Sequence, residues 1–439
     1  MSTNKERAFK LLNEISYVRV AGTKEEERCA NQLLDYCKAH GIECEIETFE
    51  IDMANIEKAT LEVNGAESFE VKCEGIGNSG VTEDEGVCAP LCYVENVLEA
   101  NIQDVKGKIV LISGPVKPEQ MKKMHDDGAV GYIQIFGSIY DPEEMWPEIR
   151  TRNTKYKPGE EINFPGVVIH ISDAEKILRA NPETVKICLK QELNSKGVSR
   201  NVIATIKGEE KPEEIITFTA HFDSVIYSNG AWDNATGSVT IMELMHYFQE
   251  HKPSRTLKFI WCGAEEIGLK GSKAYVEKHK EELKNYLFNI NVDMTGVLIG
   301  FDIAVCSCEE SCAKYIDYLG KIEGFPIASK VDMYSSDSTS FAMVGVPAVT
   351  FARLAPQGGA TIHSRRDIMD RLDPQVFINT VNFMASFAEK MINAKVFPVS
   401  KQMPKELAEK MDRMKKMFAE MEGKKEEPKK EEAKKEEQK

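Results

Sequence analysis

Hydrophobic and polar positions change their spacing at several points along the chain. Residues 5–15 and 24–39 repeat apolar side chains at helical spacing, and Gly41 follows the second repeat as a stop signal. Residues 43–51 then alternate with the two-residue period of a strand. The pattern therefore predicts two helices followed by a strand at the start of the chain.

From about residue 54 to 193, short apolar runs alternate with turns marked by Gly and Pro. Buried strands are predicted at 105–112, 128–135 and 165–171, and a helix at 118–127 separates the first two. This stretch predicts a smaller, β-rich α/β unit.

From residue 201 onward, apolar strands alternate with amphipathic helices. The alternating elements are predicted at 201–206, 215–220, 238–249, 256–262, 272–279 and 287–292. Such alternation is typical of a mainly parallel, doubly wound α/β sheet with helices on both faces. A further helix at 375–393 completes this unit.

The last part of the chain is dominated by Met, Lys and Glu. A helical pattern runs from Pro404 to Glu422, and a Lys/Glu repeat follows at 423–439. Because the repeat lacks apolar residues that could form a core, we expect it to be disordered or a fluctuating helix.

These changes divide the chain into four predicted parts. Residues 1–53 form the first part of the larger domain, 54–194 an inserted domain, and 195–398 the main part of the larger domain. Residues 399–439 form a helical or disordered tail.

Composition limits the classes of function. The 439 residues exceed one ordinary domain, and 42% hydrophobic with 29% charged residues is compatible with a large folded core. The net charge of −15 argues against nonspecific nucleic-acid binding and against docking on an anionic membrane. No apolar run approaches the roughly 18 residues that span a bilayer. Because of the negative charge and the lack of such a run, we expect neither nucleic-acid nor membrane partners.

The N-terminal residues and the cysteines predict the compartment. The first ten residues are charged and lack the apolar stretch of a signal peptide. The eleven cysteines are scattered and odd in number, which favours free thiols in a reducing, cytoplasmic compartment. Cys306, Cys308 and Cys312 lack a CxxC pair and a nearby His, so we interpret them as ordinary thiols.

Polar side chains stand where the predicted strands of the larger unit end. Because the ligand site of an open α/β sheet lies outside the carboxyl ends of its strands, we expect these side chains to meet at one edge. In chain order they are His221 and Asp223, Asp233, Glu265 and Glu266, Asp293, and His363.

These residue types suit metal chemistry. Two imidazoles with several carboxylates form a nitrogen and oxygen set for Zn²⁺, with Mn²⁺ or Co²⁺ as substitutes. If one carboxylate bridges, such a set can hold two ions about 3.5–4 Å apart, the arrangement used in two-metal hydrolysis. Glu265 and Glu266 are neighbours whose side chains diverge in extended backbone, so one can bind metal while the other acts as general base.

Five segments carry a resemblance to a known family. They are Ala220-His-Phe-Asp-Ser224, Asp233-Asn-Ala-Thr-Gly237, Gly263-Ala-Glu-Glu-Ile-Gly-Leu-Lys-Gly-Ser272, Asn291-Val-Asp-Met294 and Ile362-His-Ser364. In this order they resemble the M28 metallopeptidases, the aminopeptidase Y and bacterial leucyl aminopeptidase family, whose members have the zinc-peptidase fold. The inserted stretch resembles a protease-associated (PA) domain through 105–112 and 128–131.

The resemblance implies two divalent metal ions, with Zn²⁺ as the expected metal. His221 and Asp293 would hold one ion, Glu266 and His363 the other, and Asp233 would bridge them. The implied activity is an exopeptidase that removes N-terminal residues from peptides with a free N-terminus, by means of a metal-activated water.

The resemblance also implies roles for three further residues. Glu265 would be the general base, and Asp223 would orient the His221 ring. Tyr334 stands near a tyrosine that stabilises the oxyanion in some relatives, and a packed or rim-facing tyrosine is the other open interpretation. Trp232 replaces a residue that is often small or acidic in relatives, which predicts a narrower, more apolar rim beside Asp233.

Two other functions stay open. A carboxypeptidase or dipeptidase of the same fold would recognise a substrate carboxylate, for which Arg353, Arg365 and Arg366 are candidates. A catalytically inactive binding module is the alternative of a different class, and the complete set of ligands and the intact Glu265 argue against it.

Overall fold

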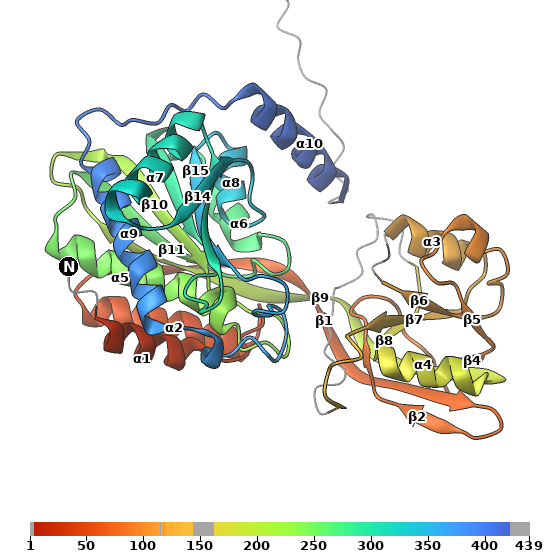
Figure 1. Ribbon diagram of the computed structural model, residues 1–439. Helices are drawn as coiled ribbons and strands as arrows, with labels where there is room; N and C mark the ends of the chain where they lie inside the picture. The colour runs from red at the N-terminus through yellow and green to blue at the C-terminus, as the bar shows by residue number, and fades with distance from the viewer. Residues whose placement is uncertain (1–3, 115, 117, 144–161, 422–439) are drawn as a thin grey trace, which may run out of the picture.

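Two lobes joined by a pair of long strands make up the protein (Figure 1). The structure is a computed structural model that describes residues 4–114, 116, 118–143 and 162–421. The predicted disordered tail at 423–439 therefore lies outside the described residues.

A ten-stranded sheet with the order β14-β13-β15-β12-β10-β11-β9-β1-β2, in which β4 also pairs with β9, forms the centre of the larger lobe and extends through β1 and β9 into the smaller lobe, where β2 and β4 lie (Figure 1). Its strands are β1 (Glu43–Asn64), β2 (Phe69–Val71), β4 (Val87–Ala89), β9 (Thr184–Ile206), β10 (Lys211–His221), β11 (Arg255–Cys262), β12 (Tyr286–Val292), β13 (Phe301–Ser307), β14 (Ile327–Val331) and β15 (Ala348–Leu354). The strands β11, β10, β12 and β15 at its centre are parallel, and β9 and β13 join them antiparallel. The predicted α/β class with a mainly parallel sheet is confirmed.

Helices cover both faces of this sheet. The helices of the chain are α1 (Lys5–Ile15), α2 (Lys24–Ala39), α3 (Pro118–Asp126), α4 (Ile171–Ala180), α5 (Thr236–Glu250), α6 (Lys270–Lys278), α7 (Glu310–Glu323), α8 (Ser338–Met343), α9 (Pro374–Ile392) and α10 (Lys405–Met421). The main hydrophobic core joins α1, α2, α5, α7 and α9 to one face of the sheet. A smaller core joins α6 and α8 to the other face.

Local sequence explains where these helices begin and which face they bury. The Thr23 side chain accepts a hydrogen bond from the backbone N–H of Glu26 and so caps α2. Cys29, Leu33 and Cys37 follow at helical spacing and are buried. The helix therefore packs one apolar stripe onto the sheet and leaves most of its charged residues in water, with Glu26 as a buried exception.

The smaller lobe has a five-stranded sheet of its own. Its strands are β3 (Cys73–Gly75), β5 (Leu91–Tyr93), β6 (Ile109–Ser113), β7 (Gly131–Phe136) and β8 (Gly166–His170), in the order β3-β8-β7-β6-β5. Two hydrophobic cores that draw only on residues 56–189 hold this lobe together. Its resemblance to a protease-associated domain stays a prediction.

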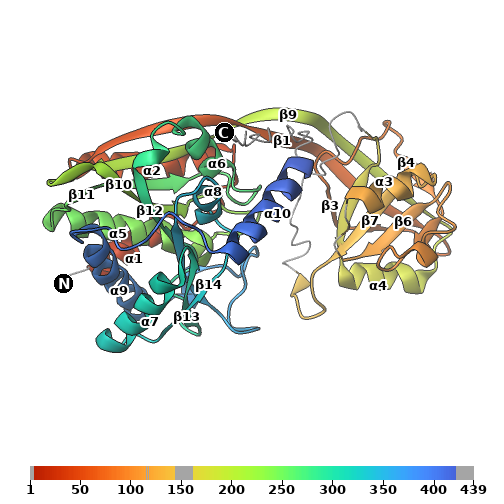
Figure 2. The same cartoon turned by 90° about the horizontal axis from the view of Figure 1, so that it is seen from above.

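The two lobes are connected by strands and not by loops. β1 and β9 pair antiparallel from Glu43 opposite Thr205 to Asn64 opposite Thr184, and they run from one lobe into the other (Figures 1 and 2). The pairing register shifts between Met53 and Asn55 and again between Ile56 and Lys58. The boundaries predicted at 53/54 and 194/195 fall inside these strands.

α10 lies beyond α9, against the side of the larger lobe that faces the smaller lobe (Figure 2). All eleven cysteines are free thiols, and Cys306, Cys308 and Cys312 are buried with their sulfur atoms within 4.8 Å of one another. Among the described residues, no helix combines the length and the hydrophobicity needed to cross a membrane.

Candidate metal centre and active site

The larger sheet delivers the predicted site residues from the carboxyl ends of its central strands. β10 ends at His221, and Asp293 directly follows β12. Glu265 and Glu266 come three and four residues after the end of β11. These strands are neighbours in the sheet, so their ends bring the side chains to one place.

Five of the predicted residues form two groups that share Asp233. His221 Nε2 lies 3.1 Å from Asp233 Oδ1 and 3.6 Å from Asp293 Oδ1. His363 Nε2 lies 2.9 Å from Asp233 Oδ2 and 2.9 Å from Glu266 Oε2. Each group offers three ligand atoms within 4.8 Å of one another, as a metal ion requires.

The donor atoms of these groups fit divalent cations. Among the described residues, the buried atoms His221 Nε2, Asp293 Oδ1 and Glu266 Oε1 have no hydrogen-bond partner. Buried polar atoms are normally satisfied, and bound cations in the two groups would satisfy acceptors of this kind. Nitrogen and carboxylate oxygen together are the ligands of Zn²⁺ and related ions.

The electrostatics of the cluster lead to the same conclusion. Burial raises the pKa of Glu265 and of Glu266 well above the usual value, and neighbouring carboxylates raise both further. Burial raises the pKa of Asp233 in the same way. For His221 burial opposes the charged form, but Glu265 and the other carboxylates raise the pKa well above its usual value. The cluster therefore concentrates buried acidic groups whose charged forms a bound cation would stabilise.

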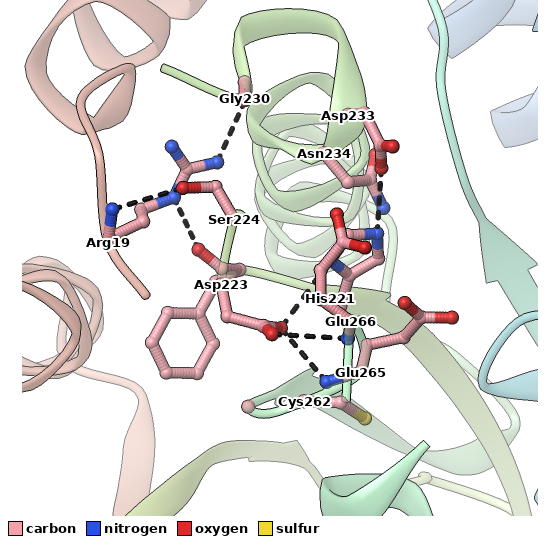
Figure 3. A network of polar contacts seen from close by, with 12 residues as sticks. Arg19, His221, Asp223, Ser224, Gly230, Asp233, Asn234, Cys262, Glu265 and Glu266 are labelled. Atoms are coloured by element: carbon pink, nitrogen blue, oxygen red, sulfur yellow. Dashed lines mark hydrogen bonds and ion pairs between the residues drawn. The ribbon is translucent and has the colours of Figure 1, made fainter. Parts of the chain in front are cut away.

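Asp223 lies beside the Glu265–Glu266 pair (Figure 3). Its two carboxylate oxygens accept hydrogen bonds from the backbone N–H groups of Glu265 and Glu266, at 3.1 and 3.2 Å. One of the same oxygens lies 3.5 Å from His221 Nδ1. The fully buried Asp223 thus fixes the backbone of both glutamates as well as facing the imidazole ring.

Arg19 fixes the loop between His221 and Asp233 (Figure 3). Its buried guanidinium donates hydrogen bonds to the backbone carbonyls of Phe222, Asn229 and Gly230. The backbone N–H of Arg19 donates to Ser224 Oγ at 3.0 Å. A side chain from the N-terminal segment therefore sets the distance between two predicted metal-binding residues.

Asp233 is held from a second direction. It lies in the π-helical turn η3 (Ala231–Ala235) ahead of α5, and its peptide bond to Asn234 is cis. The buried carboxylate of Asp367 accepts hydrogen bonds from the backbone N–H groups of Trp232 and Asp233, at 2.7 and 3.1 Å. The loop that carries His363 therefore also positions the shared carboxylate.

The backbone is unusual at three points of the site. Ala264, Met294 and His363 adopt positive φ angles of 55°, 65° and 57°. Such conformations are costly for residues other than glycine and recur at functional sites. The first precedes Glu265 and the second follows Asp293, so each re-aims a polar side chain at the cluster.

The structure also places the less certain residues of the site. Tyr334 is half-buried in an apolar cluster with Trp232 and Met294, and burial with nearby Asp293 raises its pKa. Trp232 itself is buried, in agreement with an apolar rim beside Asp233. Asp337, which precedes α8, is fully buried, and burial raises its pKa to about 6.

Arg19 and Asp367 are structural residues of the site that sequence reasoning missed. Arg19 had a usable signal, because it is a single charge inside the apolar run 18–21. Asp367 had none, because acidic residues are common in loops. The metal-binding and catalytic roles of the predicted residues stay predictions.

The sequence matches a known protein family over the part of the chain that carries this site. Residues 201–388 match the sequence profile of peptidase family M28. The chain is 27% identical over 356 residues to aminopeptidase YwaD of Bacillus subtilis, covering 80% of this chain and 70% of the relative. It is 24% identical to carboxypeptidase Q of Xenopus laevis, covering 72% of each protein.

Solved structures share the fold. A zinc aminopeptidase from Bacillus subtilis superposes with a TM-score of 0.76 at 23% identity, covering 92% of this chain and 99% of the other. A family M28 peptidase precursor from Shewanella amazonensis gives 0.75 at 22% identity, covering 92% and 96%. Both comparisons cover the two lobes together.

Proposed function

The chain belongs to peptidase family M28, and from this premise we propose that it is a two-metal aminopeptidase that removes N-terminal residues from peptides. The observation that carries the proposal is the pair of ligand groups that share Asp233. Glu265, which is in neither group, lies close enough to His221 and Asp293 to interact with both electrostatically. Zinc is the proposed metal, because the donor set is imidazole nitrogen and carboxylate oxygen.

Residues of the chain have separate roles in the proposed reaction. When bound, two divalent ions would polarise the scissile carbonyl and lower the pKa of the attacking water. The Glu265 carboxylate takes the proton from that water and passes it to the leaving amine nitrogen. Asp223 keeps the Glu265 backbone and the His221 ring in place, through contacts at 3.1 and 3.5 Å. The Tyr334 hydroxyl is the proposed donor to the carbonyl oxygen as charge develops there.

An apolar wall supports preference for an apolar N-terminal residue. The cluster beside the shared Asp233 contains Trp232, Met294 and Val297, with Tyr334 and Ile362 partly exposed at its edge. An aliphatic or aromatic side chain that enters there loses contact with water, which favours its binding by about 25 cal/mol per Å² buried. We therefore expect kcat/KM to be higher for leucyl and phenylalanyl substrates than for aspartyl and lysyl substrates.

The carboxypeptidase or dipeptidase alternative deserves a test, because carboxypeptidase Q is among the relatives. The three candidate arginines already have protein partners. Arg353 binds Asp302 and the carbonyl of Val297, and the Arg366 guanidinium lies 2.9 Å from Asp141. Arg365 lies 4.1 Å above the ring of Tyr227. This favours the aminopeptidase over an enzyme that uses these cations for a substrate carboxylate.

A panel of substrates tests the proposed function. Amino acid amides, N-acetylated amides and N-acyl dipeptides with a free carboxylate are compared, with and without added Zn²⁺, Mn²⁺ or Co²⁺. We expect hydrolysis of the free-amine amides alone, and its loss on chelation. Activity on the N-blocked substrates but not the free amines would overturn the proposal.

The general base is tested by Glu265→Gln. Because the amide is nearly isosteric but cannot take a proton, kcat should fall by about 10²–10⁴-fold. The amount of bound metal should stay at the wild-type value, since Glu265 belongs to neither ligand group. A variant with full activity would rule out this mechanism.

A further inference from the structure

The segment from His363 to Asp367 connects the predicted metal site to the smaller lobe. Arg366 Nη2 lies 2.9 Å from Asp141 Oδ1, which follows β7 of the smaller lobe. Arg365 stacks on Tyr227, whose hydroxyl lies 2.5 Å from Glu74 Oε1 on β3. The smaller lobe therefore touches the rim of the site through two acidic side chains.

Asp141 is a fixed acceptor in this contact. Its side chain is 9% exposed, and its second oxygen accepts a hydrogen bond from the backbone N–H of Ser138 at 2.6 Å. The same oxygen lies 3.3 Å from His170 Nε2, at the end of β8. Because its own lobe holds Asp141 in place, the carboxylate sets the direction of the Arg366 side chain.

Arg366 lies within reach of a short substrate. It is three residues from His363, and a chain of three residues spans at most about 10 Å. Its side chain is 37% exposed, and the hydrogen bond from its backbone N–H to Ser364 Oγ, at 3.0 Å, fixes its turn. A guanidinium in that place is suited to bind a carboxylate with two parallel hydrogen bonds.

We propose that Asp141 is a specificity-determining residue, which pairs with Arg366 and so withholds from the rim a cation that would bind the carboxylate of a very short peptide. The inference rests on the proposed aminopeptidase function and adds a substrate class to it. Because Arg366 is paired with Asp141, the free carboxylate of a dipeptide adds nothing to its binding affinity. The kcat/KM for longer peptides and for C-terminally amidated peptides is then at least as high as for free dipeptides.

The test compares a dipeptide with its C-terminal amide. In Asp141→Asn, Arg366 keeps its charge but loses its anionic partner, so it becomes available to the substrate. We expect the ratio of kcat/KM for free acid over amide to rise roughly fivefold, the effect of one partly exposed charged hydrogen bond, through a lower KM. In a tripeptide the carboxylate lies about 3.5 Å farther away, and the rise should be smaller.

A double variant separates this effect from a structural one. Asp141→Asn combined with Arg366→Gln should return the acid-to-amide ratio to the wild-type value, because the liberated cation is gone. Asp104→Asn removes a carboxylate paired with Lys108 on the same lobe and should leave the ratio unchanged. If Asp141→Asn does not fold, Asp141→Ser serves the same purpose.

The outcomes distinguish the inference from the function it rests on. An unchanged ratio in a folded Asp141 variant that still hydrolyses the amide would overturn the inference alone. A rise that persists in the double variant would also overturn it, since Arg366 would then not be the cause. If the wild-type protein did not hydrolyse the dipeptide amide, this result would instead contradict the proposed aminopeptidase function itself.

Discussion

Asp233 belongs to both ligand groups, one oxygen facing His221 and the other facing His363. The other two carboxylates belong to one group each: Asp293 is in the group of His221, and Glu266 is in the group of His363. Removing an unshared imidazole therefore damages one group and leaves three donors in the other. This asymmetry can be measured by counting metal ions.

His363→Ala should lower the zinc content from about two ions per chain to about one. The group of His221, Asp233 and Asp293 stays complete, and three protein donors suffice for one ion. Metal content after gel filtration is measured by inductively coupled plasma mass spectrometry, with His125→Ala on α3 as the control. Loss of both ions, or retention of both, would contradict two groups with separate ligands.

Glu26 should make stability fall as pH rises. It is fully buried, and burial raises its pKa to about 7, although Gly22 N–H and Arg200 stabilise its charge. The folded state therefore holds its proton to a higher pH than the unfolded state, whose pKa is near 4.5. Its stabilising contribution is complete below about pH 4.5 and is lost as pH rises to about 7.

The measurement is the free energy of unfolding of Glu26→Gln and of wild type at pH 5.5 and at pH 8. The variant mimics the protonated form, so its stability relative to wild type should rise by about 2 kcal/mol between these pH values. Glu27→Gln changes an exposed neighbour and should show no such rise. An equal difference between Glu26→Gln and wild type at both pH values would contradict the raised pKa.

Single residues were predictable where they broke a local pattern. His221, Asp293 and the Glu265–Glu266 pair stand at or just after the buried carboxyl ends of strands, where solvated charge is unexpected, and the structure brings them together. Residues that act on backbone atoms, such as Asp367, could not be found in this way. Their partners are N–H groups whose positions depend on the finished fold.

At the scale of elements, α10 supports the loop that carries Tyr334. Leu407 and Met411 are buried against Ala342 of α8 and against Met333. Lys410 pairs with Asp332, and this partner lowers the pKa of Asp332 to about 2. The helix thus packs on both ends of the segment between β14 and α8.

Leu407→Ala should loosen α10 without unfolding the larger lobe. A buried Leu→Ala change costs about 2 kcal/mol or more, which corresponds to a roughly 30-fold larger open population of a locally docked element and a similar increase in amide exchange. Amide hydrogen exchange in α10 is the measurement, with the exposed Glu409→Ala as the control. Equal exchange in Leu407→Ala and wild type would show that this contact does not hold the helix.

Elements with clear periodicity were predicted with correct bounds. The helices at 5–15 and 24–39 agree with α1 and α2, because each buries a regular apolar stripe. β1 was predicted only to residue 51, since beyond it most positions are half-buried and the alternation fades. β13 and α7 were missed, partly because Asp302 interrupts the apolar pattern of β13 and is satisfied by a distant arginine.

At the scale of the whole molecule, the two lobes have separate hydrophobic cores. The main core of the larger lobe draws on residues before 47 and after 201, and the cores of the smaller lobe draw on 56–189. The strands that connect them are paired at Asp52 and Lys196. The larger lobe therefore contains what it needs to fold.

Replacing residues 53–195 by Asn-Gly should give a folded larger lobe. This dipeptide closes a two-residue hairpin, and Asp52 and Lys196 are already opposite each other. We expect one cooperative unfolding transition by circular dichroism and hydrolysis of amino acid amides. Because Asp141 is deleted, the free-acid to amide ratio should also rise. An insoluble product, or one without a cooperative transition, would show that the lobes depend on each other for folding.

The ribbon of β1 and β9 also determines how the lobes can move. Paired strands resist stretching along their length but bend across their plane, and bending is easiest where the hydrogen-bond ladder is irregular. The two register shifts at residues 53–58 lie between the lobes and define such a place. A rotation of the smaller lobe about this place would separate Asp141 from Arg366, so the ion pair between them would act as a latch between the lobes.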